Sequence, residues 1–264
     1  MAESVVSPAW LSANRDRVTV LDVRDRWEYD GIGHVPGAVN VPFEEFRAEE
    51  HAAAGGDGSG MLPGADVFAT RFGEAGITSA DHVVAYDDHH GVFAARVLIT
   101  AALNGHPFDR LHLLDGDFSA WQRERATRTE PPSVDPVSYE VQPPTEAPLI
   151  DAESVAAVTP GEEAVIVDTR DTEEYEAGHI PGAIRLDWRE LVDDQSRGLK
   201  ATETIESILS DYGINRAKRV VLYCNTARRI SHTYFVLRWL GYPDVAFYEG
   251  SLTEWKASGR PIES

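Results

Sequence analysis

The sequence predicts an α/β protein of two domains, each a mainly parallel sheet with helices on both faces. Three observations predict this fold class: the chain contains an internal repeat, short apolar runs alternate with helical patterns, and prolines cluster between the two copies. Near-continuous apolar strands that alternate with helices are typical of parallel sheets covered on both faces.

The internal repeat consists of four motifs that recur in the same order. The matched ranges are 20–25 with 166–171, 33–38 with 178–183, 82–86 with 219–223, and 115–121 with 249–255. Because the order is kept while the intervening loops shorten, we interpret the chain as two copies of one domain.

A proline-rich stretch separates the copies. Closely spaced prolines exclude both a helix and a central strand, so we expect residues 127–147 to form an extended linker. The N-terminal domain is then predicted over 1–126 and the C-terminal domain over 148–264.

The second copy shows the alternation of strands and helices most clearly. We expect strands over 164–167, 219–223 and 245–248, and helices over 202–209, 230–240 and 252–257. In such sheets, ligands bind at the carboxyl ends of the strands, where the loops collect. Cys224 directly follows the second of these strands, which places it at one of those ends.

Length and cysteine content bound the class of protein. The 264 residues suffice for two domains with cores of their own, and no stretch reaches the roughly 20 apolar residues of a membrane helix. The first residues lack the basic and apolar segments of a secretory signal, and one cysteine cannot form an intramolecular disulfide. We therefore expect a cytoplasmic protein.

The chain is strongly acidic, with 44 acidic against 24 basic residues and a net charge of −20. Lys200, Lys218 and Lys256 are its only lysines. Since nucleic acids and anionic membranes are polyanions, we expect neither as a partner. The acid-rich, lysine-poor composition resembles that of proteins from salt-loving microbes, in which salt screens the repulsion between like charges. An ordinary acidic protein is the alternative interpretation.

Cys224 is the only cysteine and the strongest candidate for chemistry. Backbone N–H groups at the start of the following helix, together with Arg228 and Arg229, would favour the ionised thiolate. The alternative is a buried structural cysteine, because free cysteine is among the most buried residue types. A core cysteine needs no pair of arginines beside it, so the loop favours a nucleophile.

Several motifs together resemble the tandem-domain rhodanese family of thiosulfate sulfurtransferases. They are the Asp-x-Arg element at 168–170, Gly-His-Ile-Pro-Gly-Ala at 178–183, the loop cysteine, and the segment 248–255. The resemblance covers nearly the whole chain. It implies a persulfide on Cys224, an active loop in the C-terminal domain, a catalytically silent N-terminal domain, and no cofactor.

The first copy has no thiol at the matching position, where Asp87 stands. The residues that follow are Asp88, His89, His90 and Gly91. We expect such an acidic loop neither to attack sulfur nor to cradle an anion well.

The chemistry of the second loop can be argued from its residues. A thiolate at Cys224 would attack the outer sulfur of thiosulfate, sulfite would leave, and cyanide, a thiol or an unknown acceptor protein would take the sulfur. The candidates for binding the anionic donor are the loop and its two guanidinium groups: Asn225, Thr226, Ala227, Arg228 and Arg229. The alternative for either arginine is a solvated surface charge. Asp168 ends a strand in this copy and is a candidate for shaping the pocket.

Two departures from the family pattern limit how far the substrate can be inferred. Members that use 3-mercaptopyruvate usually carry Cys-Gly-Ser-Gly-Val-Thr at the loop, which this chain lacks. Many members also place an arginine where Glu174 stands, and whether Arg185 or Arg189 replaces it stays open. We therefore expect thiosulfate as the donor, with 3-mercaptopyruvate as the alternative.

Two other function classes remain to be weighed. Cysteine-dependent phosphatases and arsenate reductases of related fold use Cys-x5-Arg, whereas here Ile230 is six residues after Cys224 and the arginine comes one residue early. The shorter loop favours sulfur transfer. A non-catalytic binding or regulatory module is also possible, but the retention of Cys224 argues against it.

The remaining polar residues are expected to be structural. His34 and His179 recur in both copies, including the copy without a thiol, which favours a role in packing or in fixing a turn. His82, His89 and His90 lie near two aspartates but lack the spacing of a metal site, so we expect no metal. The oligomeric state and the physiological acceptor are not encoded in any motif.

Overall fold

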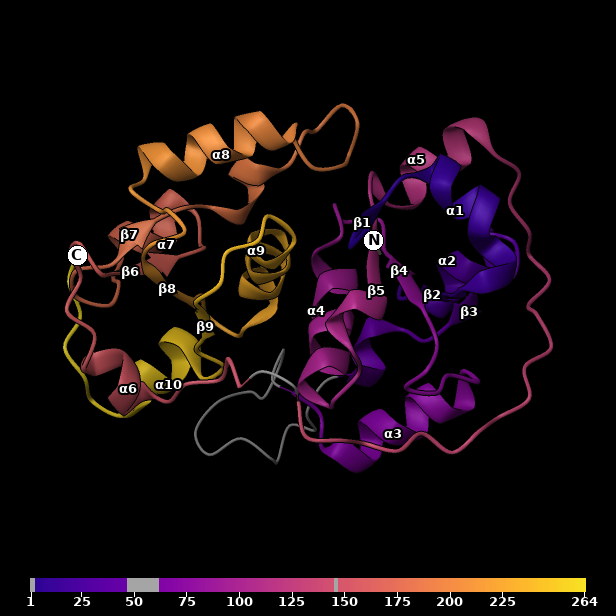
Figure 1. Cartoon of the computed structure of the whole chain (residues 1–264), viewed down its shortest axis with the longest axis horizontal. Helices are drawn as coiled ribbons and strands as arrows, with labels where there is room; N and C mark the ends of the chain where they lie inside the picture. Colours follow the sequence, from indigo (N-terminus) through magenta and orange to yellow (C-terminus); the bar gives the residue numbers. More distant parts are fainter. Residues whose placement is uncertain (1–2, 47–61, 145–146) are drawn as a thin grey trace. The chain divides into compact units, whose positions relative to one another are not determined.

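The computed structural model describes residues 3–46, 62–144 and 147–264, which form two compact units. Unit 1 contains residues 3–46, 62–144 and 147 together with Asp194–Leu199, and unit 2 contains Pro148–Asp193 and Lys200–Ser264. Figure 1 shows a sheet with helices in each unit. Within the described ranges, no helix has both the length and the apolar character that crossing a membrane requires.

Unit 1 is built on a five-stranded sheet of order β1-β5-β4-β2-β3 in which every neighbouring pair is parallel. Its strands are β1 (Val5–Val6), β2 (Thr19–Asp22), β3 (Val39–Asn40), β4 (Val83–Tyr86) and β5 (Leu111–Leu114). Its helices are α1 (Pro8–Asn14), α2 (Arg26–Gly31), α3 (Ala65–Glu74), α4 (Val92–Leu103) and α5 (Asp117–Glu124), with short 3-10 turns η1 (Arg15–Arg17), η2 (Phe43–Phe46) and η3 (Phe108–Arg110).

Helices cover both faces of the unit 1 sheet (Figure 1). On one face, Val20, Val84 and Leu114 of the strands pack with Leu11 of α1 and Trp121 of α5. Because successive strand side chains point to opposite faces, the intervening residues face the other side of the sheet, where α4 contacts β4 and β5. The near-continuous apolar strands predicted from the sequence are therefore explained by burial on both sides.

Unit 2 repeats this plan with a four-stranded parallel sheet of order β7-β6-β8-β9. Its strands are β6 (Ala164–Asp168), β7 (Ile184–Arg185), β8 (Arg219–Tyr223) and β9 (Val245–Phe247). Its helices are α6 (Ala152–Ala156), α7 (Thr172–Glu176), α8 (Thr202–Asp211), α9 (Arg228–Trp239) and α10 (Ser251–Ala257), with the turn η4 (Trp188–Leu191). A single parallel bridge from Leu149 to Phe247 stands where unit 1 has β1.

The predicted elements of the second copy are confirmed, with one difference that bears on function. Helix α9 begins at Arg228, two residues before the predicted start. Ala227 adopts a left-handed conformation with φ of +63°, which turns the chain sharply out of the loop and into the helix. Arg228 and Arg229 are therefore the first two residues of α9 rather than part of the loop.

The proline-rich stretch is extended, and it packs on unit 1. Val137 donates its backbone N–H to Gly73 O at 2.9 Å, and Arg128 forms an antiparallel bridge with His34. Tyr139 is buried among the aromatic rings of α3. This stretch is therefore part of the unit 1 structure over the residues that the model describes.

Unit 1 also includes the distant segment Asp194–Leu199. Arg197 donates from Nε to Asp117 Oδ2 at 3.1 Å, and its Nη2 also contacts the Asp88 carbonyl oxygen. Leu199 donates its backbone N–H to Asp115 Oδ1 at 2.8 Å. The side chain of Asp117 is fully buried, so Arg197 supplies a counter-charge to an otherwise costly buried carboxylate.

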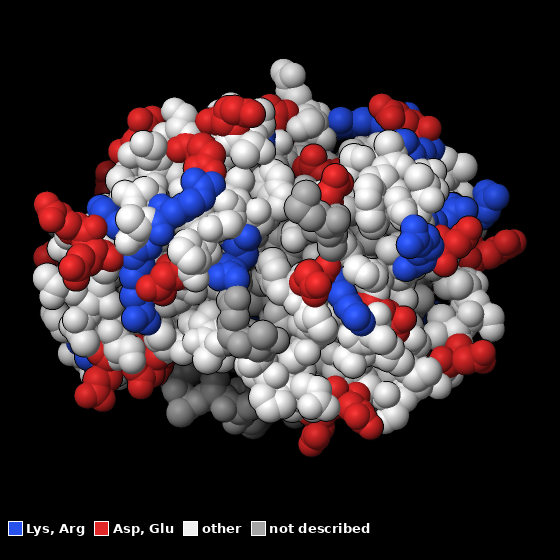
Figure 2. Space-filling model, viewed as in Figure 1, with Lys and Arg blue, Asp and Glu red and all other residues white. Residues whose placement is uncertain are grey.

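The excess of acidic side chains is visible on the molecular surface. Acidic side chains are scattered over the face drawn in Figure 2, with arginine and lysine side chains between them. On this face, acidic and basic side chains are interspersed rather than gathered by sign.

Candidate functional site

Cys224 is the first residue after β8 and is buried, with 1 % of its surface exposed. Its backbone is held from the start of α10, because Cys224 N–H donates to Ser251 Oγ at 3.2 Å and Leu252 N–H donates to Cys224 O at 2.9 Å. Thr253 Oγ1 donates to the carbonyl oxygen of Asn225 at 2.8 Å. Sequence analysis missed Ser251 and Thr253, whose role depends on contacts between segments far apart in the chain.

The loop from Cys224 to Ala227 leads directly into the N-terminus of α9. Asn225 and Thr226 are half-buried, Ala227 is buried, and the two arginines that open the helix are half-buried. The unpaired N–H groups of a helix N-terminus stabilise negative charge nearby. The structure thus brings the thiol, the helix start and Arg229 together, as the sequence predicted.

Arg229 forms a two-point ion pair with Glu174, the third residue of α7. Its Nη2 donates to Glu174 Oε1 at 2.8 Å and its Nη1 donates to Oε2. Hydrogen bonding from Arg229 lowers the pKa of Glu174 to about 2, although burial opposes this shift. Burial opposes the charged form of Arg229, yet the hydrogen bond to Glu174 and the field of Cys224 raise its pKa above the ordinary value.

A buried network connects this ion pair to the centre of the sheet. Asp168 is fully buried and accepts from Arg170 Nε at 2.9 Å and Nη2 at 2.6 Å. Arg170 Nη1 donates to Asn225 Oδ1 at 3.3 Å, and Asn225 Nδ2 donates to Glu174 Oε1 at 2.5 Å. Asp168, a sequence candidate for shaping the pocket, is therefore linked through Arg170 to the cysteine loop.

The two arginines considered as replacements for the missing cation at position 174 are engaged elsewhere. Arg185 forms an ion pair with Glu190 at 2.9 Å. Arg189 donates to Asp187 at 3.0 Å and is 56 % exposed. Neither contact is directed at Cys224.

The corresponding loop of unit 1 holds an anion of its own. The Asp87 carboxylate accepts four backbone N–H groups, from His89, Gly91, Phe93 and Ala94, at 2.8 to 2.9 Å. Burial raises the pKa of Asp87, and these hydrogen bonds counter that shift. The backbone amides of this loop are therefore occupied by the side chain of Asp87 itself, a contact that the sequence did not reveal.

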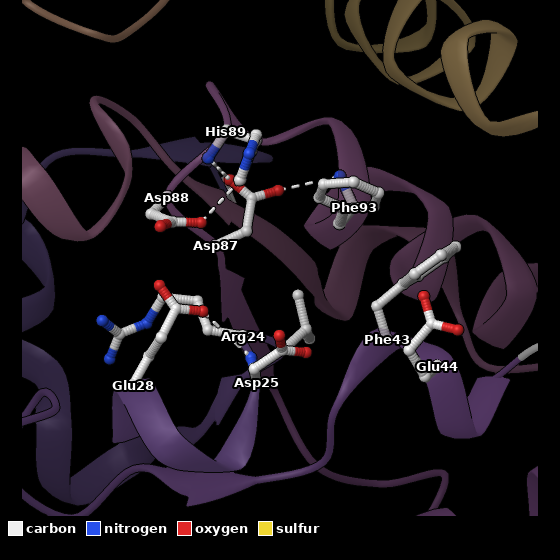
Figure 3. Close-up of a pocket in the computed structure, with 10 residues that line it drawn as sticks. Arg24, Asp25, Glu28, Phe43, Glu44, Asp87, Asp88, His89 and Phe93 are labelled. Carbon is white, nitrogen blue, oxygen red and sulfur yellow. Dashed lines mark hydrogen bonds and ion pairs between the residues drawn. The ribbon is translucent and has the colours of Figure 1, made fainter. Parts of the chain in front are cut away.

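A pocket of about 190 Å³ opens beside Asp87 (Figure 3). It is lined by Val23, Arg24, Asp25, Glu28, Phe43, Glu44, Asp87, Asp88, His89 and Phe93. Burial and the neighbouring Asp88 raise the pKa of Glu28 to about 7, while hydrogen bonds from Glu28 and His89 lower the pKa of Asp88 despite its burial. This wall of carboxylates is unsuited to an anionic substrate.

The conserved plan of the two units explains the repeated histidines. His34 stacks on Tyr29 with ring centroids 3.7 Å apart, and His179 stacks on Tyr175 at 3.8 Å. Each ring Nδ1 also lies within hydrogen-bond distance of the backbone oxygen of its tyrosine. The predicted role in packing and turn geometry is confirmed for both. Among the described residues, no group of three His, Cys, Asp or Glu side chains is arranged to hold a metal ion.

Comparison with known protein families gives a match in each half of the chain. Residues 7–124 and residues 151–258 each match the model of the rhodanese-like domain. The two matches coincide with the two sheets and their helices.

Curated relatives match the chain over most of its length. Sulfur carrier protein TtuD of Thermus thermophilus is 32 % identical over 96 % of this chain and 93 % of its own length. A thiosulfate sulfurtransferase of Pseudomonas aeruginosa is 31 % identical over 84 % of this chain and 82 % of its own.

Solved structures share the fold. The crystal structure of the 3-mercaptopyruvate sulfurtransferase SseA of Escherichia coli is similar with a TM-score of 0.79 and 25 % identity, over 94 % of this chain and 98 % of that one. The enzyme EanB in complex with ergothioneine has a TM-score of 0.85 at 19 % identity, over 99 % of this chain and 70 % of that one. At that identity the likeness to EanB shows the fold alone.

Proposed function

Because this chain belongs to the rhodanese family, with two rhodanese-like domains in tandem, we propose that it is a thiosulfate sulfurtransferase that works through a persulfide on Cys224. The observation that carries the proposal is the placement of Cys224 at the carboxyl end of β8, beside Arg229 at the start of α9. The catalytic domain is then the C-terminal one, 148–264. The N-terminal domain, 1–126, is catalytically silent.

In the first half-reaction, the Cys224 thiolate attacks the outer sulfur of thiosulfate. The sulfur–sulfur bond of thiosulfate breaks, its electron pair leaves with sulfite, and the transferred sulfur stays on Cys224 as a persulfide anion. In the second half-reaction, cyanide or a thiolate attacks the outer persulfide sulfur and the Cys224 thiolate is restored. No oxidant or reductant is consumed in the transfer.

The loop residues have distinct parts in this scheme. The charge of Arg229 interacts with Cys224 and, together with Arg228, the preceding residue of α9, would attract the anionic donor. The backbone N–H groups of Asn225, Thr226 and Ala227 lie between the thiol and the helix and stabilise charge on the persulfide. Asp168 holds Arg170, which fixes Asn225 and hence the loop.

Two alternatives share the Cys224 persulfide but differ in the substrate. The 32 % identity to a sulfur carrier protein favours a version in which a partner protein accepts the sulfur. The structural likeness to a 3-mercaptopyruvate sulfurtransferase favours that compound as the donor. The loop from 224 to 229 departs from the Cys-Gly-Ser-Gly-Val-Thr sequence that is usual in mercaptopyruvate enzymes, which argues against that donor.

The test is to incubate the purified chain with thiosulfate and measure sulfite release and the mass of the Cys224 peptide. We expect one sulfur atom to be added to Cys224, and cyanide to remove it as thiocyanate. Cys224→Ser should form neither product. If Cys224→Ser transferred sulfur as fast as the parent, the mechanism would be wrong. Parallel assays with 3-mercaptopyruvate and an aryl phosphate separate the rival substrates.

The amino-acid composition supports a proposal for the cellular compartment and the salt concentration in which the protein works. A lone reactive thiol functions best in a reducing compartment, so we place the protein in the cytoplasm. A net charge of −20 with three lysines favours activity in concentrated salt, which screens the acidic surface.

A further inference from the structure

Glu174 forms an ion pair with Arg229, the arginine whose charge interacts with Cys224. Both of its carboxylate oxygens accept from Arg229, and Oε1 also accepts from the amide of Asn225 at 2.5 Å. Such a two-point pair between a planar guanidinium and a carboxylate is among the stronger ionic contacts in proteins. Any anion that binds Arg229 must therefore compete with a carboxylate that is already there.

The position of Glu174 is fixed by the fold. Asp171 caps the N-terminus of α7 by accepting from the backbone N–H of Glu174 at 2.9 Å. From the other side, Asn225 reaches Glu174 and is itself held by Arg170 on the fully buried Asp168. The carboxylate is 28 % exposed and lies between two elements that both border the cysteine loop. It is a built part of the site rather than a mobile surface charge.

The pairing is specific to the unit that contains the thiol. Glu28 has the same place in unit 1, as the third residue of α2, but there its side chain is hydrogen-bonded to Asp88, and Arg24 acts on it only as a nearby charge. The second residue of α4 is Phe93, where α9 has Arg229. Within the described residues of the two units, the glutamate at this helix position is therefore hydrogen-bonded to an arginine only beside Cys224.

We propose that Glu174 is a specificity-determining residue that, by neutralising Arg229, shifts the preference of the Cys224 site from doubly charged sulfur donors towards singly charged ones. This inference rests on the proposed sulfur transfer and refines its substrate class. Organic thiosulfonates are suitable singly charged probes, because they present the same outer sulfur on a sulfonyl group that has an organic substituent in place of one oxyanion.

The reaction with such a donor balances in the same way as that with thiosulfate. The Cys224 thiolate attacks the terminal sulfur of the thiosulfonate anion and the sulfur–sulfur bond breaks. The electron pair leaves with the sulfinate, and Cys224 retains the transferred sulfur. The two donors therefore differ in charge at the leaving group, which is the part of the donor that Arg229 would meet.

The first experiment compares kcat/KM for thiosulfate and for benzenethiosulfonate in the parent, E174Q and E28Q. Removing one negative charge a few ångströms from the donor is expected to raise the ratio of thiosulfate to thiosulfonate kcat/KM about tenfold in E174Q. E28Q, the matched change in unit 1, should leave the ratio unchanged. If E174Q lowered both values equally, Glu174 would only position Arg229 and the inference would be overturned.

The second experiment does not require sulfur transfer. Cys224 is the only cysteine, so alkylation reports on this site alone. Iodoacetate carries a negative charge and iodoacetamide carries none, and the neutral reagent corrects for changes in access to the thiol. We expect the ratio of the iodoacetate to the iodoacetamide rate to rise about tenfold in E174Q and to stay at the parent value in E28Q.

Together, the two experiments distinguish failure of the proposed role of Glu174 from failure of the proposed sulfur transfer. A normal persulfide with an unchanged alkylation ratio in E174Q would overturn the role of Glu174 while leaving the proposed function intact. A raised alkylation ratio with no persulfide from any donor would support the electrostatic role of Glu174 but overturn sulfur transfer.

Discussion

The loops that follow β4 and β8 occupy equivalent places in their units, yet they hold negative charge in opposite ways. After β4, the Asp87 carboxylate accepts four backbone N–H groups and is a permanent ligand of its own loop. After β8, a thiol stands in that place, and Arg229 rather than a phenylalanine is the second residue of the next helix. The comparison shows that the amides of this loop hold an anion in unit 1, the carboxylate of Asp87. Under the proposed function, two side chains make the equivalent loop of unit 2 reactive rather than structural.

The most severe test of this comparison moves the thiol from one loop to the other. In a double variant with Cys224→Ser and Asp87→Cys, we expect sulfite release from thiosulfate at least about a thousandfold below the parent. The transplanted thiol would face the carboxylates of Glu28 and Asp88 with no arginine at the start of α4. Alkylation of the new cysteine and a thermal melt would show that it is present in a folded protein.

Recovery of a tenth or more of the parent rate in the double variant would contradict the comparison. It would mean that the amide cradle and the thiol suffice without the cation.

The next largest effect concerns stability. Asp87→Ala removes the acceptor of four backbone N–H groups, two of them in buried hydrogen bonds, so we expect the free energy of unfolding in urea to fall by about 3 kcal/mol. Cys224→Ala, the matched change in unit 2, should cost about 1 kcal/mol, because it removes only one buried sulfur atom. The reverse ranking of the two variants would show that the carboxylate is not the structural element of its loop.

The loop after β4 is also held by Asp117 and Arg197, which contact His90 and the carbonyl oxygen of Asp88. Arg197→Ala leaves the fully buried carboxylate of Asp117 without its cation, and we expect a loss of about 2 kcal/mol in the free energy of unfolding. In unit 2 the matching residue is Ser251, a neutral hydroxyl that needs no such partner. Arg197→Lys should recover part of the loss.

The control for Arg197 is Arg26→Ala. Arg26 is 72 % exposed and pairs with Asp30 along α2, so its removal should cost less than about 0.5 kcal/mol. Equal losses for the two arginines would show that the buried pair has no special role.

The smallest expected effect is a difference in the sign of the pH dependence at the two equivalent glutamates. Burial and Asp88 raise the pKa of Glu28 from 4.5 to about 7, so its contribution to stability is present at low pH and is lost as pH rises from about 4.5 to 7. Arg229 lowers the pKa of Glu174 to about 2, so that contribution is present above about 4.5 and is lost as pH falls towards 2.

The measurement is the free energy of unfolding against pH for the parent, Glu28→Gln and Glu174→Gln. Both groups are half-buried, and screening by solvent reduces each effect to about 1 kcal/mol or less. Glu28→Gln should flatten the curve between about pH 4.5 and 7, and Glu174→Gln should flatten it below 4.5. Curves that flatten in the same pH range would refute the contrast between the two units.

Much of the fold could be predicted because the repeat supplies two independent examples of each element. The strand 219–223 and the helices after 201 and 250 follow from apolar runs bounded by polar loops, which are local signals. The early start of α9 could not be predicted, because it depends on a left-handed turn at Ala227, a residue with no general preference for that conformation.

Only those residues of the candidate site that are close together in the chain could be predicted from the sequence. Cys224 and Arg229 are five residues apart, so a strand followed by a helix is enough to bring them together. The ion pair between Glu174 and Arg229 joins residues 55 positions apart, and sequence analysis treated Glu174 only as a missing cation. The hydrogen bonds from backbone N–H groups to the Asp87 carboxylate could not be predicted either, because every residue except proline has such an N–H group and the sequence does not show where it points.

The segment Asp194–Leu199 has a consequence for the evolution and engineering of this tandem protein. A gene truncated in the proline-rich stretch would encode a first half that lacks Arg197 and therefore the counter-charge of Asp117. Expressed alone, the first half would therefore lack the ion pair to which we assign about 2 kcal/mol of stability. The boundary between the two sequence repeats is thus not the boundary of the folded unit 1.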